Sequence, residues 1–427
     1  MKRFWPLAYS FIVIPLLWAV IQTMGIVNAK TRRGIRGRKR LFEDLQLQVR
    51  ALPQGRRIWF HSSSMGEFEQ AKPIIAELKR RHPDVIVIVS FFSPSGFEHS
   101  RAYAPAGVIT YIPFDTRANA RRFLDLIRPD AAVMVRYDIW PNHIWELRHR
   151  KIPVLIANAT MRERTRRRTP VARSFHHEVY NAIDDILTVA QSDADAFRHF
   201  FLDHPVIQTI GDTRYDQVSI RSAEARKRHL IPPAVTGGKK IVVIGSSWPE
   251  DEEVVLGAAL PLIAASDDVL FIIVPHEPTE EHLEGLERQL AGKTLRFSAL
   301  NEYAGERVIV VDSVGILTIL YAHAQIAFVG GSFRQGIHNV LEAAVYGIPV
   351  LFGPKHRNSH EPLMLVEHGG AFVVNDSDDL HRTLKHLLED ERARAAAGEH
   401  AARFVASHVG ATDRFLAHLE RRLDERS

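Results

Sequence analysis

The sequence predicts an α/β protein built from two parallel β-sheets, one in each half of the chain. Short apolar runs alternate with helical patterns such as Glu69–Arg81 and Ala118–Ile127, and this alternation is typical of parallel sheets with covered faces. A polar stretch, Arg221–Lys240, separates the runs into two series. The length of 427 residues and the apolar fraction of 46% are sufficient for two domains with their own cores.

Each half contains six apolar runs that we interpret as strands. In the first half they are Ile58–His61, Val85–Phe92, Ala131–Val135, Val154–Ala157, Ile186–Val189 and Val206–Ile210. In the second half they are Ile241–Ile244, Val269–Val274, Val308–Val311, Ile326–Val329, Val350–Phe352 and Phe372–Val374. We therefore predict two Rossmann-like domains, 41–220 and 241–410, joined by a linker at 221–240. Ligands are expected in a cleft between them, at the carboxyl ends of the strands. A final helix at 411–427 could pack back on the first domain.

The N-terminal 40 residues are predicted to be a membrane anchor with a basic flank. Phe4–Ala29 contains no charged residue and is long enough to span a bilayer, and seven lysines and arginines follow within Lys30–Arg40. A cleaved signal peptide is the alternative, since Val27-Asn28-Ala29 resembles a cleavage site. The length of the run and the dense positive charge favour a retained anchor with the remaining chain in the cytoplasm. Whether the segment crosses the membrane or lies in its surface stays open, and the domains are expected to fold without it.

Composition excludes several kinds of chemistry. The chain has no cysteine, so disulfides, thiolate metal sites and cysteine nucleophiles are excluded. The net charge of +5 is concentrated at Lys30–Arg40 and Arg162–Arg173, which favours an anionic membrane surface or a phosphate over nucleic acid. The closest histidine groups, His176-His177 and His356 with His360, lack a convincing ligand set, so we expect no metal.

The segment from Ile326 to Pro354 predicts a strand–loop–helix–strand unit that could hold a nucleotide sugar. Its loop carries Gly330-Gly331-Ser332, Gly336 and His338-Asn339, and the helical pattern runs from Val340 to Gly347. Glycines at a helix N-terminus allow a phosphate to approach backbone N–H groups, and Glu342 could bind ribose hydroxyls. The alternative is ordinary turn chemistry, with Glu342 complementing the helix dipole.

Polar loops follow other predicted strands. Glu67 ends the loop that begins at His61, near a helix start at Phe68, where the dipole would keep a general base ionised. Acidic residues are also common in first turns for structural reasons. The arginine run is either a solvated face or a contact for a phosphate-bearing partner; it consists of Arg162, Arg164, Arg166, Arg167 and Arg168.

Six motifs in this order resemble the Kdo transferases, which transfer 3-deoxy-D-manno-octulosonic acid (Kdo) from CMP-Kdo to the lipid A precursor. They are His61–Glu67, Ile139–Asn142, Asn158-Ala159, Gly211–Asp216, Val329–Phe333 and His338–Glu342. The resemblance implies a GT-B fold, an inner-membrane enzyme facing the cytoplasm, and inverting transfer without a metal. It also implies that Glu67 is the base and that Arg214 replaces a lysine thought to stabilise the transition state.

The same resemblance implies the donor site. Pro275 and His276 would meet the cytidine, Val314, Gly315 and Ile316 would line the nucleotide, and Asn339, Val340, Leu341 and Glu342 would hold phosphate and ribose. The remaining candidate substrate-binding residues are Ser64, Gly66, Ser246, Ser247, Gly331, Ser332, Gly336 and His338.

Some positions depart from the family pattern. Arg136 stands where the family usually has the first glutamate of E-T-E-L-W-P-N, and Asp138 keeps the second acid. His276-Glu277 replaces arginine-histidine, and Ile316 replaces a glutamate. Two alternatives remain: another GT-B enzyme that uses a UDP-sugar, and a membrane-anchored nucleotide-binding module without catalysis.

Overall fold

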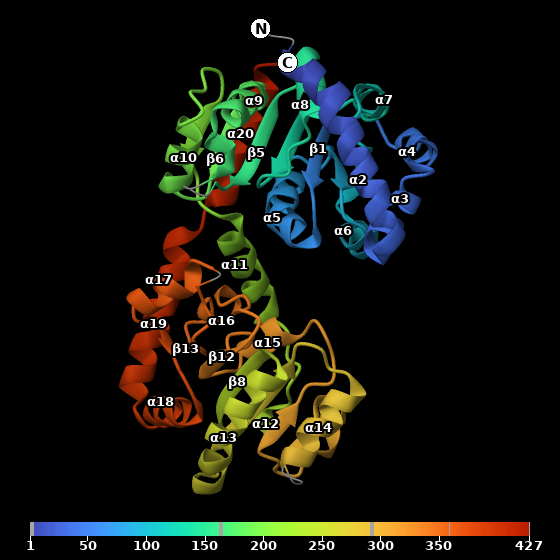
Figure 1. The fold of residues 1–427 in the computed structure, drawn as a ribbon. Coiled ribbons are helices and arrows are strands. Elements are labelled where there is room, and N and C mark those ends of the chain that lie inside the picture. Colours follow the sequence, from blue (N-terminus) through green and yellow to red (C-terminus); the bar gives the residue numbers. More distant parts are fainter. Residues whose placement is uncertain (1–3, 162–164, 291–293, 358, 427) are drawn as a thin grey trace. The chain divides into compact units, whose positions relative to one another are not determined.

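The computed structural model describes residues 4–161, 165–290, 294–357 and 359–426. The chain forms two compact units (Figure 1). Unit 1 comprises Met1–Gln217 and Gly410–Ser427, and unit 2 comprises Val218–Val409.

Unit 1 is built on a seven-stranded parallel sheet with the order β3-β2-β1-β4-β5-β6-β7. Its strands are β1 (Arg57–Ser62), β2 (Ile86–Phe91), β3 (Ala106–Tyr111), β4 (Ala131–Val135), β5 (Val154–Ala159), β6 (Asp185–Thr188) and β7 (Val206–Thr209). Trp59 in β1 pairs with Ile88 on one side and with Ala132 on the other. The strand order reverses between β1 and β4, so their carboxyl ends form the switch point where ligands of such sheets bind.

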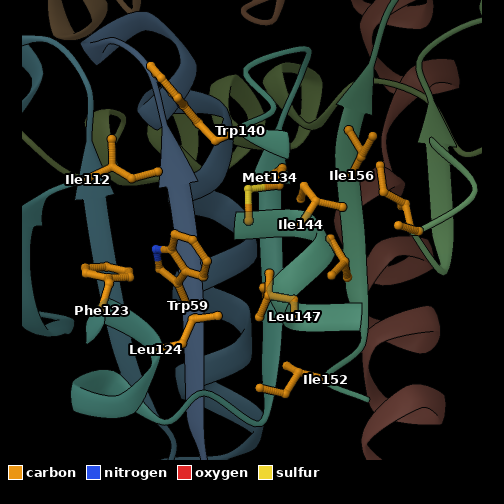
Figure 2. Close-up of a cluster of buried hydrophobic side chains, with 14 of the residues drawn as sticks. Trp59, Ile112, Phe123, Leu124, Met134, Trp140, Ile144, Leu147, Ile152 and Ile156 are labelled. Carbon is orange, nitrogen blue, oxygen red and sulfur yellow. The ribbon is translucent and has the colours of Figure 1, made fainter. Parts of the chain in front are cut away.

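Helices cover both faces of this sheet, and each face has its own core. The helices are α5 (Met65–Arg81), α6 (Pro94–Ser100), α7 (Arg117–Ile127), α8 (Pro141–His149), α9 (Pro170–Tyr180), α10 (Gln191–Arg198) and α20 (Ala411–Asp424). Helix α11 (Thr213–Ala225) begins in unit 1 and continues into unit 2. One core surrounds Trp59, Phe123 and Trp140, as Figure 2 shows. The other contains Phe60 from β1 and Phe415 from α20. The side chains of consecutive residues in β1 therefore pack into the cores on opposite faces of the sheet, as the pleat of a strand requires.

The C-terminal helix α20 packs on unit 1 and is capped by a distant side chain. The Asp216 carboxylate accepts hydrogen bonds from the N–H groups of Gly410 and Thr412, at 2.5 and 2.7 Å. An acid at a helix N-terminus satisfies unpaired N–H groups and interacts favourably with the dipole. Asp216 therefore has a structural role within the Gly211–Asp216 motif.

Unit 2 contains a second seven-stranded parallel sheet, ordered β10-β11-β9-β8-β12-β13-β14. Its strands are β8 (Lys240–Ser247), β9 (Val269–Pro275), β10 (Thr294–Arg296), β11 (Val308–Val310), β12 (Ile326–Val329), β13 (Val350–Phe352) and β14 (Ala371–Val373). Its helices are α12 (Pro233–Thr236), α13 (Pro249–Ala265), α14 (Glu280–Leu290), α15 (Leu317–Tyr321), α16 (Leu341–Ala344), α17 (Glu361–Glu367), α18 (Ser377–Glu389) and α19 (Glu391–His408). The switch point lies between β8 and β12.

All twelve predicted strands are present, and the fold-class prediction of two parallel α/β sheets is confirmed. Two edge strands, β3 and β10, were not predicted. Residues 221–240, predicted as a linker, include the end of α11 and all of α12, and they cluster with unit 2. The helix predicted to run from Val340 to Gly347 is wrong in length, since α16 covers only Leu341–Ala344.

The apolar N-terminal segment is helical and belongs to unit 1. It forms α1 (Phe4–Ala8), a π-helical turn η1 (Tyr9–Val13) and α2 (Ile14–Val27), and it is long and apolar enough to cross a membrane. Only 11% of its most apolar window is buried, and Phe11, Leu16 and Ile26 are at least 60% exposed. Two basic or amphipathic helices follow it, α3 (Ala29–Gly37) and α4 (Leu41–Arg50).

Polar contacts fix one side of this segment to the sheet domain. The Tyr9 hydroxyl donates to the buried Asp115 carboxylate at 2.9 Å. Asp115 also accepts hydrogen bonds from the N–H groups of Asn142 and His143, both at 3.1 Å. The segment is therefore part of the fold of unit 1, and its deletion should cost stability as well as membrane affinity.

We expect Tyr9→Phe to lower the free energy of unfolding of unit 1 by about 1.5–3 kcal/mol, because it removes a hydrogen bond to a buried carboxylate. Trp5→Phe is the matched control, since it removes an exposed hydrogen bond from Trp5 to Ser174 on the same segment. That variant should lose about 1 kcal/mol or less. Urea unfolding of the full chain in detergent measures both, and equal losses would contradict a special role for Tyr9.

Candidate functional site

The switch point of unit 1 is formed around Glu67. Ser64 caps helix α5 by accepting a hydrogen bond from the Glu67 N–H at 3.5 Å, so Glu67 is the third residue of the helix. The Glu67 carboxylate folds back and accepts a hydrogen bond from the Ser63 N–H at 2.6 Å through Oε2. Within the described chain, no other hydrogen bond reaches this carboxylate, which leaves Oε1 for a ligand. A side chain placed at Gly66 would meet open space, so the approach is unobstructed there.

The pKa of Glu67 is raised above its ordinary value. Burial is the largest cause, since the residue is 6% exposed, and the negative charge of Asp138 acts in the same direction. The Ser63 hydrogen bond and the nearby His61 and Arg136 oppose the shift. The sequence analysis considered only the helix dipole and did not anticipate the effect of burial on this carboxyl group. A raised pKa suits a general base, since the ideal value lies near the working pH.

The pKa of Asp138 is lowered by contrast. Burial opposes its charge, but hydrogen bonds and interaction with His61, together with the Trp140 indole, lower its pKa. His61 Nε2 lies 2.9 Å from Asp138 Oδ2, and its Nδ1 lies 2.9 Å from the Ser90 hydroxyl. His61 is fully buried and fixes the orientation of Asp138. Two carboxyl groups whose environments move their pKa values apart are typical of acid–base sites.

Two arginines follow strands of the same sheet. Arg136 has a left-handed backbone, with φ of 63°, at the end of β4, and its charge acts on both Glu67 and Asp193. Arg214 forms an ion pair with the buried Asp212 at 2.7 Å and keeps 31% of its side chain exposed. Arg136 therefore lies directly after β4, and Arg214 is the second residue of α11, the helix that follows β7.

The Asn158 motif has a structural role. Its amide donates to the Thr213 hydroxyl at 2.6 Å and accepts from the Thr213 N–H at 3.2 Å. Thr213 in turn donates to the Gln70 carbonyl in α5 at 2.6 Å. These bonds tie β5, α5 and the loop that carries Arg214 together.

The arginine run lies partly outside the described residues, which exclude Arg162 and Arg164. Arg166, Arg167 and Arg168 form a short 3-10 helix before α9. Arg167 donates to the Tyr180 hydroxyl at 3.0 Å and so supports the fold. Nε and one terminal nitrogen of Arg168 are buried, and no hydrogen-bond partner for them is found in the described part of the chain.

The switch point of unit 2 begins with a bulge. Ser246 is an extra residue between the pairs Gly245 with Val274 and Ser247 with Pro275, and its φ is 53°. The buried Ser247 donates to Glu252 at 2.7 Å. Glu252 also contacts His282 at 2.7 Å, and its charge raises the pKa of His282 against the opposing effect of burial.

Three rings stack beside this bulge. The His276 ring stacks on both Trp248 and His338, with ring centroids 4.7 and 4.5 Å away, while the Trp248 and His338 rings lie side by side with their centroids 6.5 Å apart. The Trp248 indole N–H donates to His338 Nε2 at 2.9 Å, and burial and His276 lower the pKa of His338. A neutral His338 is therefore the acceptor of that bond. Flat, partly exposed rings at a strand end provide a stacking surface for a nucleobase.

The side chain of Asp251 fixes the conformation of the glycine loop, Gly330–Ser332. Its carboxylate accepts hydrogen bonds from the N–H groups of Trp248, Gly331 and Phe333, at 3.0, 2.7 and 3.3 Å. Ser332 is buried and accepts a hydrogen bond from the Gly353 N–H at 2.7 Å. Gly331 and Ser332 therefore stabilise the conformation of the loop through these hydrogen bonds.

The loop N–H groups that the sequence assigned to a phosphate are already paired. Gly336 donates to the Gly331 carbonyl at 2.7 Å, and His338 donates to the Gly330 carbonyl at 3.2 Å. The four-residue α16 also lacks the length for a sizeable helix dipole. The Gly336 and His338 amides are therefore committed to the loop in this structure, and the phosphate site expected at Asn339 to Glu342 stays a prediction.

Other donor-site candidates keep a polar or open surface. Asn339 donates to Glu342 at 3.2 Å, while Val340 and Leu341 are buried behind them. The loop from Val314 to Ile316 precedes α15, and Val314 is 78% exposed.

Within the described ranges, no group of three or more histidine, aspartate or glutamate side chains is arranged to hold a metal. Sequence reasoning missed His61, Trp248 and Asp251 as site residues. His61 and Trp248 lie at the carboxyl end of the first strand of their unit or directly after it, and Asp251 lies in the first turn of the helix that follows. Those positions could have singled them out.

Comparisons with known proteins agree with the motifs. Residues 33–217 match the family model described as 3-deoxy-D-manno-octulosonic-acid transferase (kdotransferase). The chain is 28% identical to the 3-deoxy-D-manno-octulosonic acid transferase of Haemophilus influenzae, over 97% of each chain. It is 29% identical to a probable mitochondrial enzyme of the same name from Arabidopsis thaliana, over 79% of each chain. The resemblance to the Kdo transferases is confirmed.

A solved structure supports the fold. A putative UDP-N-acetylglucosamine 2-epimerase from Listeria monocytogenes is similar with a TM-score of 0.59 and 13% identity, covering 87% of this chain and 98% of that one. At this identity the likeness concerns the fold alone, and together with the two sheets it confirms the GT-B class.

We expect Glu67→Gln to be at least as stable as the wild type at pH 7. A carboxyl group whose pKa is raised by folding stabilises the protein fully below its unfolded value, 4.5, and loses that contribution as the pH rises through its folded value. Glutamine keeps an acceptor for the Ser63 N–H without the buried charge. In thermal unfolding, the melting temperature of the variant should equal or exceed that of the wild type at pH 7. Any excess should disappear near pH 4. A variant clearly less stable at pH 7 would contradict a buried, costly charge at Glu67.

Proposed function

We propose that this chain is a glycosyltransferase that moves Kdo from CMP-Kdo to the lipid A precursor with inversion of the anomeric centre. The observation that carries the proposal is the Glu67 and Asp138 pair at the switch point of unit 1. One carboxyl group has a raised pKa and a free oxygen, and the other is held ionised by His61. The similarity to Kdo transferases along 97% of the chain supports Kdo as the transferred sugar. CMP-Kdo as the donor and the lipid A precursor as the acceptor are part of the proposal.

In the proposed reaction, a hydroxyl of the acceptor attacks the anomeric carbon of Kdo. Oε1 of Glu67 takes the hydroxyl proton while the bond between the anomeric carbon and the phosphate oxygen breaks and CMP leaves. Burial and the negative charge of Asp138 raise the pKa of Glu67, which favours its holding that proton. Arg214 would stabilise the charge that grows on the departing phosphate. Arg136 brings a further positive charge near Glu67, where the family has an acid.

On the donor side, the ring stack supports a nucleotide. His276 would meet the cytosine, with Trp248 extending the stacking surface beyond the residues that the sequence suggested. The backbone groups of Val314, Gly315 and Ile316 would contact the nucleotide. Asn339 and Glu342 would bind the ribose. Because the Gly336 and His338 amides already form hydrogen bonds within the loop, the negative charge of the phosphate would be stabilised mainly by side chains. The donor is an activated monophosphate ester, so we propose transfer without a metal.

For the acceptor, Arg168 is the strongest candidate of the arginine run. Its buried nitrogens need hydrogen-bond partners, and a phosphate of the lipid A precursor would provide them. We propose that the apolar N-terminal helix holds the enzyme at the cytoplasmic face of the inner membrane, where such a lipid is accessible.

Donor protection separates this function from the alternatives. CMP should raise the melting temperature of the full chain, and UDP at the same concentration should leave it nearly unchanged. Preferential protection by UDP would instead favour an enzyme that uses a UDP-sugar. Protection by CMP without any product from CMP-Kdo and the lipid A precursor would favour a non-catalytic binding module.

We expect Glu67→Gln to lower kcat by about 10²–10⁴-fold, which is the usual contribution of general-base assistance. Glutamine cannot accept the proton at neutral pH but occupies the same space. CMP affinity should stay close to that of the wild type and serves as the control. If the variant retains more than about a tenth of the wild-type kcat while chemistry limits the rate, Glu67 is not the base and Asp138 becomes the residue to test.

A further inference from the structure

An apolar groove runs beside the N-terminal helix of unit 1. It has a volume of about 500 Å³ and lies between helices α2 and α3 on one side and the ends of β2 and β3 on the other. Trp18, Ile21 and Met24 line it from α2, and Phe92, Pro94 and Phe114 line it from the sheet domain. This volume falls within the range of ligand pockets, and the lining is predominantly apolar.

The groove is continuous with the apolar surface of α2. Trp18 and Met24 are 54% and 48% exposed, so the same side chains face both the groove and the exterior. A ligand of this groove therefore reaches it along a surface that suits hydrocarbon. This excludes a compact polar metabolite as the natural occupant.

The rim of the groove is positively charged. Lys30, Arg38 and Lys39 line it, and no aspartate or glutamate does so among the described residues. Arg38 is committed to the protein, because it donates to the carbonyls of Phe92 and Ile112 at 2.6 and 3.0 Å. Lys30 and Lys39 are exposed, and a lysine ammonium attracts an anionic head group as a mobile point charge. An apolar interior with a cationic rim is complementary to a chain attached to a phosphate.

The inner end of the groove adjoins the loop of the candidate base. The Ser93 N–H, which lies in the groove wall, donates to the Ser63 carbonyl at 2.9 Å, and the Ser63 N–H donates to Glu67. The Phe92 ring stands 5.0 Å from Trp140, whose indole donates to Asp138 at 3.3 Å. Two short paths therefore connect the groove wall to the carboxylate pair.

We propose that this groove binds one acyl chain of the lipid acceptor and thereby orients its sugar hydroxyl toward Glu67. The inference rests on the proposed function, because it takes the acceptor to be an acylated, phosphate-bearing lipid. It adds a specificity site: the acyl chain is recognised by α2 and the Phe92–Pro94 segment, so the N-terminal helix is both an anchor and a wall of the binding site.

The test fills the groove without changing its polarity. Ile21→Trp places a larger apolar side chain in the groove, and Val20→Trp is the matched control, since Val20 is the preceding residue, is 53% exposed and does not line the groove. Met24→Trp is a second filling variant. Each full-length protein is compared in detergent for its Kd toward the lipid A precursor and toward the same precursor with its acyl chains removed, and then for kcat/KM with both acceptors. Direct binding keeps the test independent of turnover.

We expect Ile21→Trp and Met24→Trp to weaken binding of the acylated acceptor by about tenfold or more, which corresponds to displacing two methylenes. Binding of the deacylated acceptor and of CMP should change less than about twofold, and Val20→Trp should match the wild type in each assay. Equal affinity of wild type and filled variants for the acylated acceptor would overturn the proposal. An equal loss in Val20→Trp would also overturn it, because it would indicate a general effect of bulk in the membrane-facing helix. Acyl-dependent binding without any transfer would support the groove and refute the proposed function.

Discussion

The buried carboxylate of Asp115 is the interaction on which the organisation of unit 1 most depends. It is fully removed from solvent and gathers hydrogen bonds from the N-terminal helix, from the backbone at the start of α8 and from the His143 ring at 2.6 Å. A buried charge is tolerated only when it is fully hydrogen-bonded, so all of these segments must be in place together. Asp115 thereby holds the start of α8, which the Trp140–Asn142 segment leads into. Trp140 then reaches Asp138, so the apolar N-terminal segment and the candidate acid–base pair share one rigid support.

The two units use the same helix position in different ways. Glu67 and Asp251 are each the third residue of the helix that follows the first strand of their sheet. Both carboxylate oxygens of Asp251 accept hydrogen bonds from backbone N–H groups, and these bonds fix the glycine loop. Glu67 accepts a backbone hydrogen bond through one oxygen only, and burial together with the neighbouring Asp138 raises its pKa. The position itself is structural, and the difference in hydrogen bonding is what makes Glu67 suitable for chemistry.

The sequence predicted the alternation of strands and helices well because parallel strands buried on both faces are nearly continuous apolar runs. The missed strands lie at sheet edges: β3 begins with Ala106-Gly107 and is only partly buried, and β10 has three residues. The length of α16 was overestimated because its apolar spacing continues after the helix ends, in a turn whose Gly347 has a φ of 72°.

At the site, residue types were predictable and their hydrogen-bond partners were not. The motifs located Glu67, Asp138 and Arg214 on strand-end loops. Pattern alone could not show that the amides of Gly336 and His338 are paired, since that depends on how the loop closes on itself. It also could not separate Asn158 and Asp216, which support the fold, from neighbouring residues that face open space.

The most direct measurement is the mass spectrum of the lipid after incubation of the purified full chain with CMP-Kdo and the lipid A precursor. If unit 1 binds the acceptor and Glu67 activates its hydroxyl, the lipid gains the mass of one or more Kdo residues, and one CMP is released for each residue gained. An unchanged lipid mass, under conditions in which CMP binds and both units are folded, would contradict the proposed transfer.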